Sequence, residues 1–595
     1  MTARARSGRP MGNLPGEVTS FVGRRRETVR AVRLMRTARL LTLTGVAGVG
    51  KTRLALRVAA QVREAFPHGV WLVELAALTD GNLLPQTLAD VLDIRDQLHA
   101  PTVGMLADHL ADKRLLLVLD NCEHLVDVCA MLVSELLAAP GLQVLATSRH
   151  SLGAVGEQLL EVPPLSVPDP DQPMTTRTVA RHEAVQLFAE RAAVAQPGFA
   201  LNAGNRATVV RICQRLDGIP LAIELVALRV RAMPVTEILT RLDDYLEFLT
   251  TGSLIAVPRL QPLRAAIDWS FALCSPLEQQ LWARASVFAG EFDLEAAEAV
   301  CSGQGITRED VFDLVAALVD KSVLIRIHDD ADTLARYRML EAIRHYGQEQ
   351  LASSHHLTAV RLRHRDHYRH LVTRSEQEWL GPNELTWFTR LRREHANLRI
   401  ALAFCLTQPG QPRVGLEITA ALWHYWIRSC THTEGRYWLD QTLQLDPEPS
   451  THRAKALGVD GWLALMQADM ATARSLLEQS RELAHWLGDE LALARTTLGF
   501  GVAAFNQNDL PNAITLLQDA FALHQALNDP TGVWLALLYL AVTAAGLGDT
   551  DRAIAFSEEC LALCDTRNAY PSRIYACRGS ASVGGCPATS RQPAG

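Results

Sequence analysis

The sequence predicts a multidomain chain of the α/β plus α class, in which a parallel-sheet domain is followed by helical modules. Short apolar runs alternate with helical patterns from Phe21 to about Pro168, as expected for a parallel sheet covered by helices. A glycine-rich loop joins the first apolar run to the first helix, and a forty-residue period runs through the last third. With 595 residues the chain is too long for one hydrophobic core, so several domains are expected.

The glycine-rich loop lies between an expected strand, Leu40 to Thr44, and an expected helix, Thr52 to Ala65. Its glycines let backbone N–H groups close around phosphate oxygens, and the helix N-terminus adds a positive dipole end. Lys51 can reach the β- and γ-phosphates, and the Thr52 hydroxyl can bind Mg²⁺, so ATP, GTP or their diphosphates are expected ligands. The motif G-x-x-x-x-G-K-[ST] is formed by Gly45, Val46, Ala47, Gly48, Val49, Gly50, Lys51 and Thr52.

Three further apolar runs, 70–75, 115–119 and 142–147, are predicted to be strands that are buried on both faces of the same sheet. Residues 159–162 are a candidate for one more strand. The proline-rich segment 167–173 then reads as a connector.

Candidate catalytic residues follow two of these strands. Asp120 ends its strand as a Walker B carboxylate does, which predicts that it binds hydrated Mg²⁺ together with Thr52. The neutral amide of Asn121 cannot act as a general base. Glu123 is either that base or a solvated loop charge, and Arg149 is either a γ-phosphate sensor or a surface charge.

The middle of the chain reads as helical. Amphipathic patterns between 182 and 249 predict a lid of helices. Helices also dominate residues 258–350, but strand-like runs at 323–327 and 336–339 flank an acidic turn at 329–332. A few helices with one hairpin indicate a winged helix.

The last third repeats with a period of forty residues, which predicts an array of helical hairpins. The aspartates of this repeat follow the turn inside each hairpin and are expected to cap its second helix. The repeated positions are Asp469, Asp509 and Asp549; Ala473, Ala513 and Ala553; and Leu483, Leu523 and Leu563.

These patterns divide the chain into seven segments. The expected segments are a disordered lead (1–15), a P-loop NTPase domain (16–170), a helical lid (171–255), a winged-helix-like domain (256–350), a helical connector (351–410), tetratricopeptide-like (TPR-like) helical repeats (411–568) and a disordered tail (569–595).

Net charge, the length of apolar segments and the spacing of cysteines limit the kinds of partner that this chain is expected to bind. A net charge of -7 gives no global nucleic-acid footprint. The apolar segment 533–548 is shorter than the roughly 20 residues that a membrane span needs, so no membrane partner is expected. Eleven cysteines without C-x-x-C spacing indicate core thiols rather than metal ligands, which fits a reducing cytoplasm.

Several motifs occur in an order that resembles the signal-transduction ATPases with numerous domains (STAND), of the NB-ARC type. The chain resembles more closely the predicted ATPase region of actinobacterial LuxR-type transcriptional regulators, from about Leu14 to Asp565. The segments that carry the resemblance are Phe21–Arg24, the glycine-rich loop, Leu117–His124, Thr147–Arg149, Gly218–Ala222, Arg264–Trp269 and Asp320–Leu324.

The resemblance implies further nucleotide contacts. Val22 and Gly23 would line the adenine side, with Arg24 near the nucleotide. Pro220 would pack on the adenine or ribose from the lid, although a helix-start proline looks the same in sequence. Arg53, directly after the loop, completes the candidate nucleotide-binding set.

Two departures from the family are visible. Relatives carry a histidine in the winged helix that holds the diphosphate, whereas Leu340 stands there in this chain. This contact is therefore either absent or supplied by another residue, for which Arg336 or Arg338 are the candidates. Neither a C-terminal helix-turn-helix nor an N-terminal cyclase or DNA-binding domain is recognisable in this sequence.

The expected function is an ATP/ADP-binding switch in the regulation of transcription, with slow hydrolysis because of Asn121. A protein or small-molecule effector would bind the repeat array, and the ATP state would form a homo-oligomer. Direct specific DNA binding is not expected from this chain alone. The alternatives are a winged-helix regulator that binds DNA directly and a faster-cycling ATPase motor or chaperone.

Overall fold

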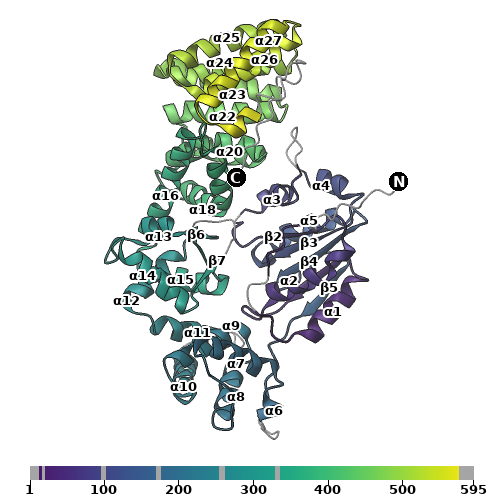
Figure 1. The fold of residues 1–595 in the computed structure, drawn as a ribbon, viewed down its shortest axis with the longest axis vertical. Coiled ribbons are helices and arrows are strands. Elements are labelled where there is room, and N and C mark those ends of the chain that lie inside the picture. Colours follow the sequence, from purple (N-terminus) through teal and green to yellow (C-terminus); the bar gives the residue numbers. More distant parts are fainter. Residues whose placement is uncertain are drawn as a thin grey trace. The chain divides into compact units, whose positions relative to one another are not determined.

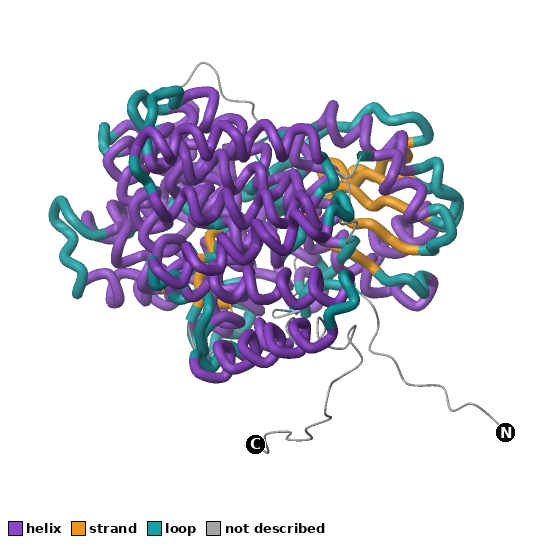
Figure 2. Tube along the Cα trace, turned by 90° about the horizontal axis from the view of Figure 1, so that it is seen from above, coloured by secondary structure: helices purple, strands orange, loops and turns teal. Residues whose placement is uncertain are grey.

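The computed structural model describes residues 12–16, 20–78, 80–94, 102–168, 176–252, 261–327 and 335–574. Contacts divide the chain into two compact units. The first comprises residues 1–93 and 102–360, and the second comprises residues 94–101 and 361–595. Figure 1 labels their elements, and Figure 2 shows that strands are confined to a few places among many helices.

The first unit begins with a five-stranded sheet in the order β2-β3-β4-β1-β5, and all of its pairings are parallel (Figure 1). The predicted parallel sheet is therefore confirmed. Because the strands are parallel, the carboxyl ends of β1, β3 and β4 meet at one edge, with β4 between the other two. The strands are β1 (Leu40–Thr44), β2 (Val70–Glu74), β3 (Leu115–Asp120), β4 (Leu142–Ser148) and β5 (Glu157–Glu161).

Helices cover the sheet in two groups, because α1 packs on α2 while α3, α4 and α5 contact one another. Apolar side chains of β1, β3 and α2, such as Leu43, Val118 and Leu54, share one buried core. These helices are α1 (Arg25–Met35), α2 (Lys51–Val62), α3 (Leu84–Val91), α4 (Val103–Leu110) and α5 (Val126–Leu136), with 3-10 turns η1 (Arg63–Ala65), η2 (Gly81–Leu83) and η3 (Cys122–His124).

The lead into this domain is more ordered than expected. Residues 1–15 were predicted to be disordered, yet Gly12 bridges to Val70 at the edge strand β2. The Asn13 side chain donates to Leu72 O at 2.9 Å and accepts from Leu72 N at 2.6 Å. One amide thus satisfies both backbone groups of an edge residue, which gives this part of the lead a reason to be ordered. Residues 1–11 lie outside the described part.

The lid and the winged helix complete the first unit. The lid consists of α6 (Thr176–Val179), α7 (Glu183–Ala195), α8 (Arg206–Arg215), α9 (Pro220–Ala227), η4 (Leu228–Arg231) and α10 (Val235–Gly252). The winged helix and its flanks consist of α11 (Gln261–Ala272), α12 (Pro276–Ala285), β6 (Phe292–Asp293), α13 (Leu294–Cys301), α14 (Asp310–Asp320), β7 (Leu324–Ile327), β8 (Arg336–Met339) and α15 (Glu341–Ser353).

The predicted hairpin of the winged helix is confirmed, since β8 pairs antiparallel with β7. The expected acidic turn at 329–332 lies outside the described residues. The two-residue strand β6 also pairs with β8, and a strand so short leaves no period in the sequence.

The second unit is helical in its described part. Helix α16 (Leu357–Gln377) leads into it from the first unit. The helices that follow are α17 (Glu384–Arg393), α18 (His395–Thr407), α19 (Pro412–Ala421), α20 (Trp423–Arg428), α21 (His432–Leu445), α22 (Thr451–Met466), α23 (Met470–Leu487), α24 (Glu490–Asn506), α25 (Leu510–Ala526), α26 (Pro530–Gly546) and α27 (Thr550–Thr566).

Helices α23 to α27 share one device at their N-termini. An aspartate caps each of them by accepting a hydrogen bond from a backbone N–H in the first turn. The residue before each aspartate has a positive φ and ends the preceding helix. The forty-residue period therefore contains two twenty-residue units, and the predicted caps are confirmed. The caps are Asp469, Asp489, Asp509, Asp529 and Asp549, and the residues before them are Ala468, Gly488, Asn508, Asn528 and Gly548.

The same unit explains a difference at the predicted disordered tail, 569–595. Asn568 has a positive φ, 55°, as do the residues before the capping aspartates, and residues 570–574 are helical. Ser572 is buried, and its N–H and hydroxyl both donate to Glu384 Oε2, at 3.1 and 2.9 Å. These bonds hold the first tail residues in place, while residues 575–595 lie outside the described part. Among the described helices, none combines the length and apolar character that a membrane span requires.

We predict that Ala468→Gly stabilises the hairpin of α22 and α23. Ala468 has a φ of 57°, a conformation that costs a residue with a Cβ about 1 kcal/mol relative to glycine. Native-state hydrogen exchange should therefore show slower local opening of α22 and α23. The matched control is Ala522→Gly, at an exposed position inside α25, which should speed local opening because glycine costs about 1 kcal/mol in a helix interior. Faster exchange in Ala468→Gly would contradict the assignment.

Candidate nucleotide site

The loop between β1 and α2 has the backbone of an anion cradle. Gly45, Gly48 and Gly50 have φ values of 148°, 73° and 94°, which side-chain-bearing residues rarely adopt. Gly50 precedes the first residue of α2, Lys51, and no side chain caps that helix. The N–H groups of the first turn therefore lack a side-chain acceptor of their own, as a phosphate site at a helix N-terminus requires.

Lys51 is folded over this loop. Its Nζ donates to Gly45 O at 2.9 Å and to Val46 O at 3.2 Å. Burial lowers the pKa of Lys51, and the positive charge of Arg149 acts in the same direction, whereas Glu123 and Asp120 oppose both. The four charged groups of the site therefore interact electrostatically at the mouth of the loop.

Asp120 is the centre of a hydrogen-bond cluster. Its Oδ1 accepts from Thr52 Oγ1 at 2.7 Å and from Thr147 Oγ1 at 2.6 Å. Thr147 in turn accepts from Asn121 N at 2.9 Å. Burial raises the pKa of Asp120, and the two threonine hydroxyls counteract that shift. The structure thus brings together the carboxylate and the hydroxyl that were predicted to bind Mg²⁺.

The donor set suits that ion. Carboxylate and hydroxyl oxygens are the hard ligands that Mg²⁺ prefers, and a site with only two protein ligands leaves positions for phosphate oxygens and water. Thr52 is exposed, so its oxygen is accessible. In the described ranges no group of three or more histidine, cysteine or acidic side chains could hold a metal by itself.

Glu123 and Arg149 form an ion pair beside this cluster. Arg149 Nε donates to Glu123 Oε1 at 3.0 Å. The other carboxylate oxygen, Glu123 Oε2, is buried and has no hydrogen-bond partner among the described residues. Both predicted residues therefore lie at the site, and one oxygen of Glu123 is available to a ligand or a water molecule.

Arg24 supports the loop from the N-terminal side. The Arg24 guanidinium donates to Val49 O at 2.9 Å and to Pro163 O, and the backbone N–H of Arg24 donates to Glu183 Oε1 at 2.7 Å. Burial lowers the pKa of Arg24, although Glu27 and Glu183 oppose this shift. The Arg24 side chain is thus engaged with the backbone, and its direct role in this structure is to position the loop.

Val22 and Gly23, the predicted adenine-side residues, are half-buried just before Arg24. A Cβ on Gly23 would lie 2.5 Å from the Glu183 carboxyl group, so a larger residue would have to displace that side chain of the first residue of α7. This contact joins the segment before the sheet to the lid.

The lid packs directly on the phosphate loop. Pro220 is the first residue of α9, and the next residue, Leu221, donates its N–H to Gly48 O at 3.3 Å. A Cβ on Gly48 would meet Leu221 and Leu263 at 3.1 Å each. The structure therefore places Pro220 next to the loop.

Arg53 joins the helix after the loop to the same lid helix. Its guanidinium lies 3.4 Å from Glu224 Oε1, and Arg191 of α7 donates to that oxygen at 3.0 Å. Arg53 also donates to Ser20 O at 2.8 Å. A lid carboxylate, that of Glu224, thus holds a residue that was predicted to contact nucleotide.

The winged helix reaches the same edge of the sheet through Arg338. Its guanidinium lies 3.2 Å from Glu74 Oε1, and Glu74 is paired with Asp120 in the register of β2 and β3. The other candidate, Arg336, is buried and bound to Glu291, so it supports the winged helix itself. Sequence reasoning missed Glu74, although it ends a parallel strand just as Asp120 does.

Comparisons with known proteins agree with this architecture. Residues 33–152, which include the loop and Asp120, match the family model described as an AAA domain. Residues 275–352 match the model described as a winged helix-turn-helix domain.

Curated relatives include "Putative HTH-type transcriptional regulator Rv0890c" of Mycobacterium tuberculosis, 37% identical over 538 residues, which are 89% of this chain and 58% of that protein. The chain therefore spans little more than half the length of that relative. "Uncharacterized protein Rv0894" of the same organism is 38% identical over 352 residues, 59% of this chain and 86% of that protein. "Regulatory protein AfsR" of Streptomyces griseus is 26% identical over 363 residues, 56% of this chain and 33% of that protein.

A solved structure has the same fold over most of the chain. It is a STAND protein with a tetratricopeptide repeat sensor from Pyrococcus horikoshii. The TM-score is 0.50 with 14% identity, and the match covers 96% of this chain and 81% of that one.

We predict that Lys51→Ala weakens ADP binding while leaving the fold intact. The ammonium group would make charge-assisted bonds to phosphate, each of about 1.5–3 kcal/mol, so affinity should fall about 10- to 150-fold. Calorimetric titration with Mg-ADP measures this change. Lys113→Ala, whose ammonium contacts His109, is the matched control and should bind ADP as the unaltered chain does. Equal affinity in both variants would remove Lys51 from the site.

Proposed function

We infer the function of this chain from its family: it belongs to the same family as the mycobacterial protein Rv0894, and it carries an AAA P-loop domain and a winged helix. We propose that the chain is an ATP/ADP-dependent switch in a regulatory pathway. One observation carries the proposal. The lid and the winged helix both contact the P-loop domain at the edge of the sheet that bears the phosphate loop and Asp120. A change of nucleotide at that edge would therefore act on both modules.

In this proposal the backbone of residues 45–50 surrounds the phosphates, and Lys51 exchanges its carbonyl partners for phosphate oxygens. Thr52 and Asp120 hold Mg²⁺, whose role is to neutralise phosphate charge. Val22, Gly23 and Pro220 enclose the nucleoside from the segment before the sheet and from the lid. Arg24 and Arg53 hold the loop and the lid in register around it.

Hydrolysis is proposed to be slow. Asn121 offers an amide where a carboxylate would be needed to accept a proton. Glu123 Oε2 is the remaining acceptor, but the other oxygen of this carboxylate accepts from Arg149, which holds the side chain in place. Slow turnover suits a switch, whereas a motor or chaperone needs fast cycling.

The pair of Glu74 and Arg338 is proposed as a latch between the P-loop domain and the winged helix. The two side chains are 60% and 42% exposed, so the pair contributes only about 0–1 kcal/mol. An interaction of that size biases an equilibrium between closed and open forms without locking it. Breaking it should therefore change rates modestly.

The remaining parts of the proposal concern partners. The helical array of the second unit would receive a protein or small-molecule effector, and the ATP form would assemble into a homo-oligomer. Homology to proteins that are named regulators supports a role in transcriptional control within the cytoplasm.

We predict that Arg338→Ala speeds ADP release about two- to fivefold, the factor that corresponds to about 0.4–1 kcal/mol. Stopped-flow displacement of a fluorescent ADP analogue measures the rate. The matched control is Arg326→Ala, an exposed arginine on the adjacent strand β7. In a double-mutant cycle, Glu74→Ala should produce the same effect, and the double variant should add nothing further. Additive effects would show that the two residues act separately.

A second candidate function is direct binding of DNA by the winged helix, which the match to a winged helix-turn-helix family favours. The helix α14 follows the two shorter helices and precedes the hairpin, so it is the candidate reading helix. It carries Asp310, Asp313 and Asp320, which would be repelled by phosphates.

We therefore predict that this chain forms no specific complex with DNA at nanomolar concentration. Gel-shift titration of genomic fragments at near-physiological salt, with competitor DNA, checks this expectation. A complex that survives the competitor would favour the second candidate, and Asp313→Lys in α14 should then strengthen it.

A further inference from the structure

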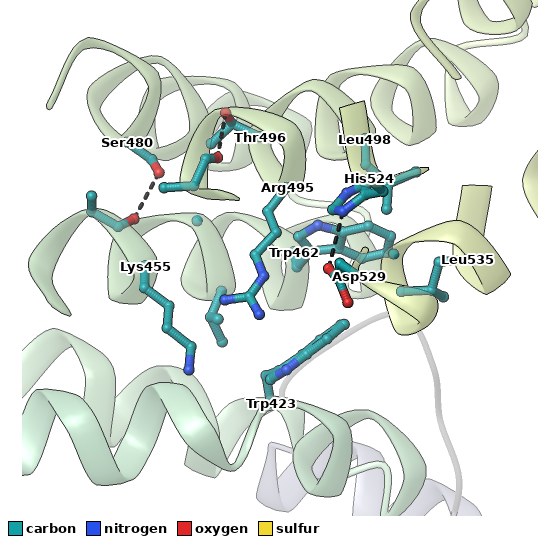
Figure 3. A pocket seen from close by; sticks show the side chains of 15 residues that line it. Trp423, Lys455, Trp462, Ser480, Arg495, Thr496, Leu498, His524, Asp529 and Leu535 are labelled. Atoms are coloured by element: carbon teal, nitrogen blue, oxygen red, sulfur yellow. Dashed lines mark hydrogen bonds and ion pairs between the residues drawn. The ribbon is translucent and has the colours of Figure 1, made fainter. Parts of the chain in front are cut away.

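A hollow in the second unit is lined by residues of the helical array and of α20 (Figure 3). Its empty space is about 470 Å³ when the part that is open to solvent is counted. The side chains that define it chemically are Trp423, Lys455, Trp462, Arg495, His524 and Asp529.

One wall of the hollow is aromatic and apolar. The rings of Trp423 and Trp462 lie 6.4 Å apart at 54°, and Trp462 also meets Tyr539 edge-on at 6.2 Å. Val459 and Leu498 add aliphatic surface. Such a wall favours a flat apolar body, because indole rings give large contact area with little conformational freedom to lose.

Two cations face this wall. Lys455 Nζ donates to Glu376 Oε2 at 2.6 Å, so the positive charge of Lys455 is paired directly with that carboxylate. Arg495 lies 3.8 Å from Glu376 Oε1, beyond hydrogen-bond distance. Figure 3 shows its side chain running across the hollow toward Trp423. The guanidinium thus keeps donors for a second anion, and a bidentate carboxylate is the partner that its planar fork fits best.

His524 supplies a third, independent feature. Its side chain is fully buried, and its Nδ1 lies 3.0 Å from Asp529 Oδ2. Neither ring nitrogen meets hydrogen-bond geometry with a partner among the described residues. The tautomer with its proton on Nδ1, beside the Asp529 carboxylate, leaves Nε2 as an acceptor. Burying an unpaired acceptor is costly, so a ligand that donates to it would be stabilised.

Glycine makes room for that histidine. A Cβ on Gly532 would lie 2.1 Å from His524 Nδ1, so any larger residue would displace the imidazole. Asp529 is also the cap of α26, which fixes its carboxylate in the same place. The acceptor is therefore built into the hollow by two backbone constraints.

We propose that this hollow binds a small aromatic acid. Its ring system would lie against Trp423 and Trp462, its carboxylate or equivalent anion would bind Arg495, and a hydroxyl or N–H group would donate to His524 Nε2. Identifying this ligand as the effector of the switch rests on the proposed function, whereas the binding site does not.

Glu376 gives such a ligand a route to the rest of the chain. It lies in the last turn of α16, the helix that leads from the first unit into the second. It also accepts from Trp423 Nε1 at 3.2 Å, so it touches three of the residues that line the hollow. An anion at Arg495 competes with Glu376 and would loosen the end of α16.

The test uses 8-anilinonaphthalene-1-sulfonate as the aromatic anion and N-phenyl-1-naphthylamine as its uncharged counterpart. Both are titrated by fluorescence into the full chain with saturating Mg-ADP, which keeps the probe out of the nucleotide site. We expect the sulfonate to bind saturably with one site per chain. Binding without saturation, or at several equal sites, would overturn the proposal.

Variants then locate the site. Arg495→Gln should weaken the sulfonate about tenfold, the loss of one charge-assisted contact, and leave the uncharged probe within about twofold. Arg495→Lys should retain most of the affinity because it keeps the charge. Arg474→Gln, an exposed arginine on α23, is the matched control and should change nothing. Equal sulfonate affinity in Arg495→Gln and Arg474→Gln would overturn the assignment.

The uncharged probe also reports whether Arg495→Gln is folded, since its binding needs only the apolar wall. If that variant loses both probes, Arg495→Lys and His524→Phe decide the question. His524→Phe keeps the ring volume and should retain the sulfonate probe, because the single N–H of this probe lies beside its own sulfonate group and is not free to donate to Nε2. Loss of sulfonate binding in Arg495→Lys, with binding of the uncharged probe retained, would count against a charge-based site. Normal ADP binding with no probe site would reject this inference and leave the proposed switch standing.

Discussion

The hydrogen bonds from Thr52 and Thr147 to Asp120 depend on one constraint, the position of β4 between β1 and β3. Parallel pairing brings the carboxyl ends of the three strands to one edge, so a hydroxyl after β1, a carboxylate from β3 and a hydroxyl from β4 converge. No single strand could build this cluster. Burial makes the carboxylate costly, and the two hydroxyls lower that cost while leaving its oxygens at the mouth of the loop.

The modules that surround this edge are attached by contacts of different strength. Gly48 accepts a backbone hydrogen bond from the lid, and a Cβ there would be crowded by Leu221 at 3.1 Å, so the lid and the loop fit closely. The winged helix, in contrast, reaches Glu74 through an exposed ion pair. A two-state switch needs one close contact and one weak contact, because the weak contact of the winged helix can then open while the lid stays packed on the loop.

Local features were predictable from the sequence, and long-range pairs were not. The strand before the loop, the loop itself and the caps Asp469, Asp509 and Asp549 follow from short-range rules of glycine, burial and capping. Glu74 and Arg338 are 264 positions apart, and the local sequence around either residue does not predict the contact with the other. Arg24 illustrates a further limit: its position near the loop was inferred from family resemblance, yet its bonds to Val49 O and Pro163 O depend on tertiary packing.

The hollow in the second unit arises where regular and irregular helices meet. Arg495, His524 and Asp529 belong to the twenty-residue units, whose repeated caps fix the helices at regular intervals. Glu376 and Trp423 come from α16 and α20, which precede the regular array and do not follow its spacing. A repeat alone would offer the same groups at every unit. Because the irregular helices contribute a carboxylate and an indole at one place only, they convert a repeated surface into one particular site, and the carboxylate lies on the helix that leads back to the nucleotide-binding unit.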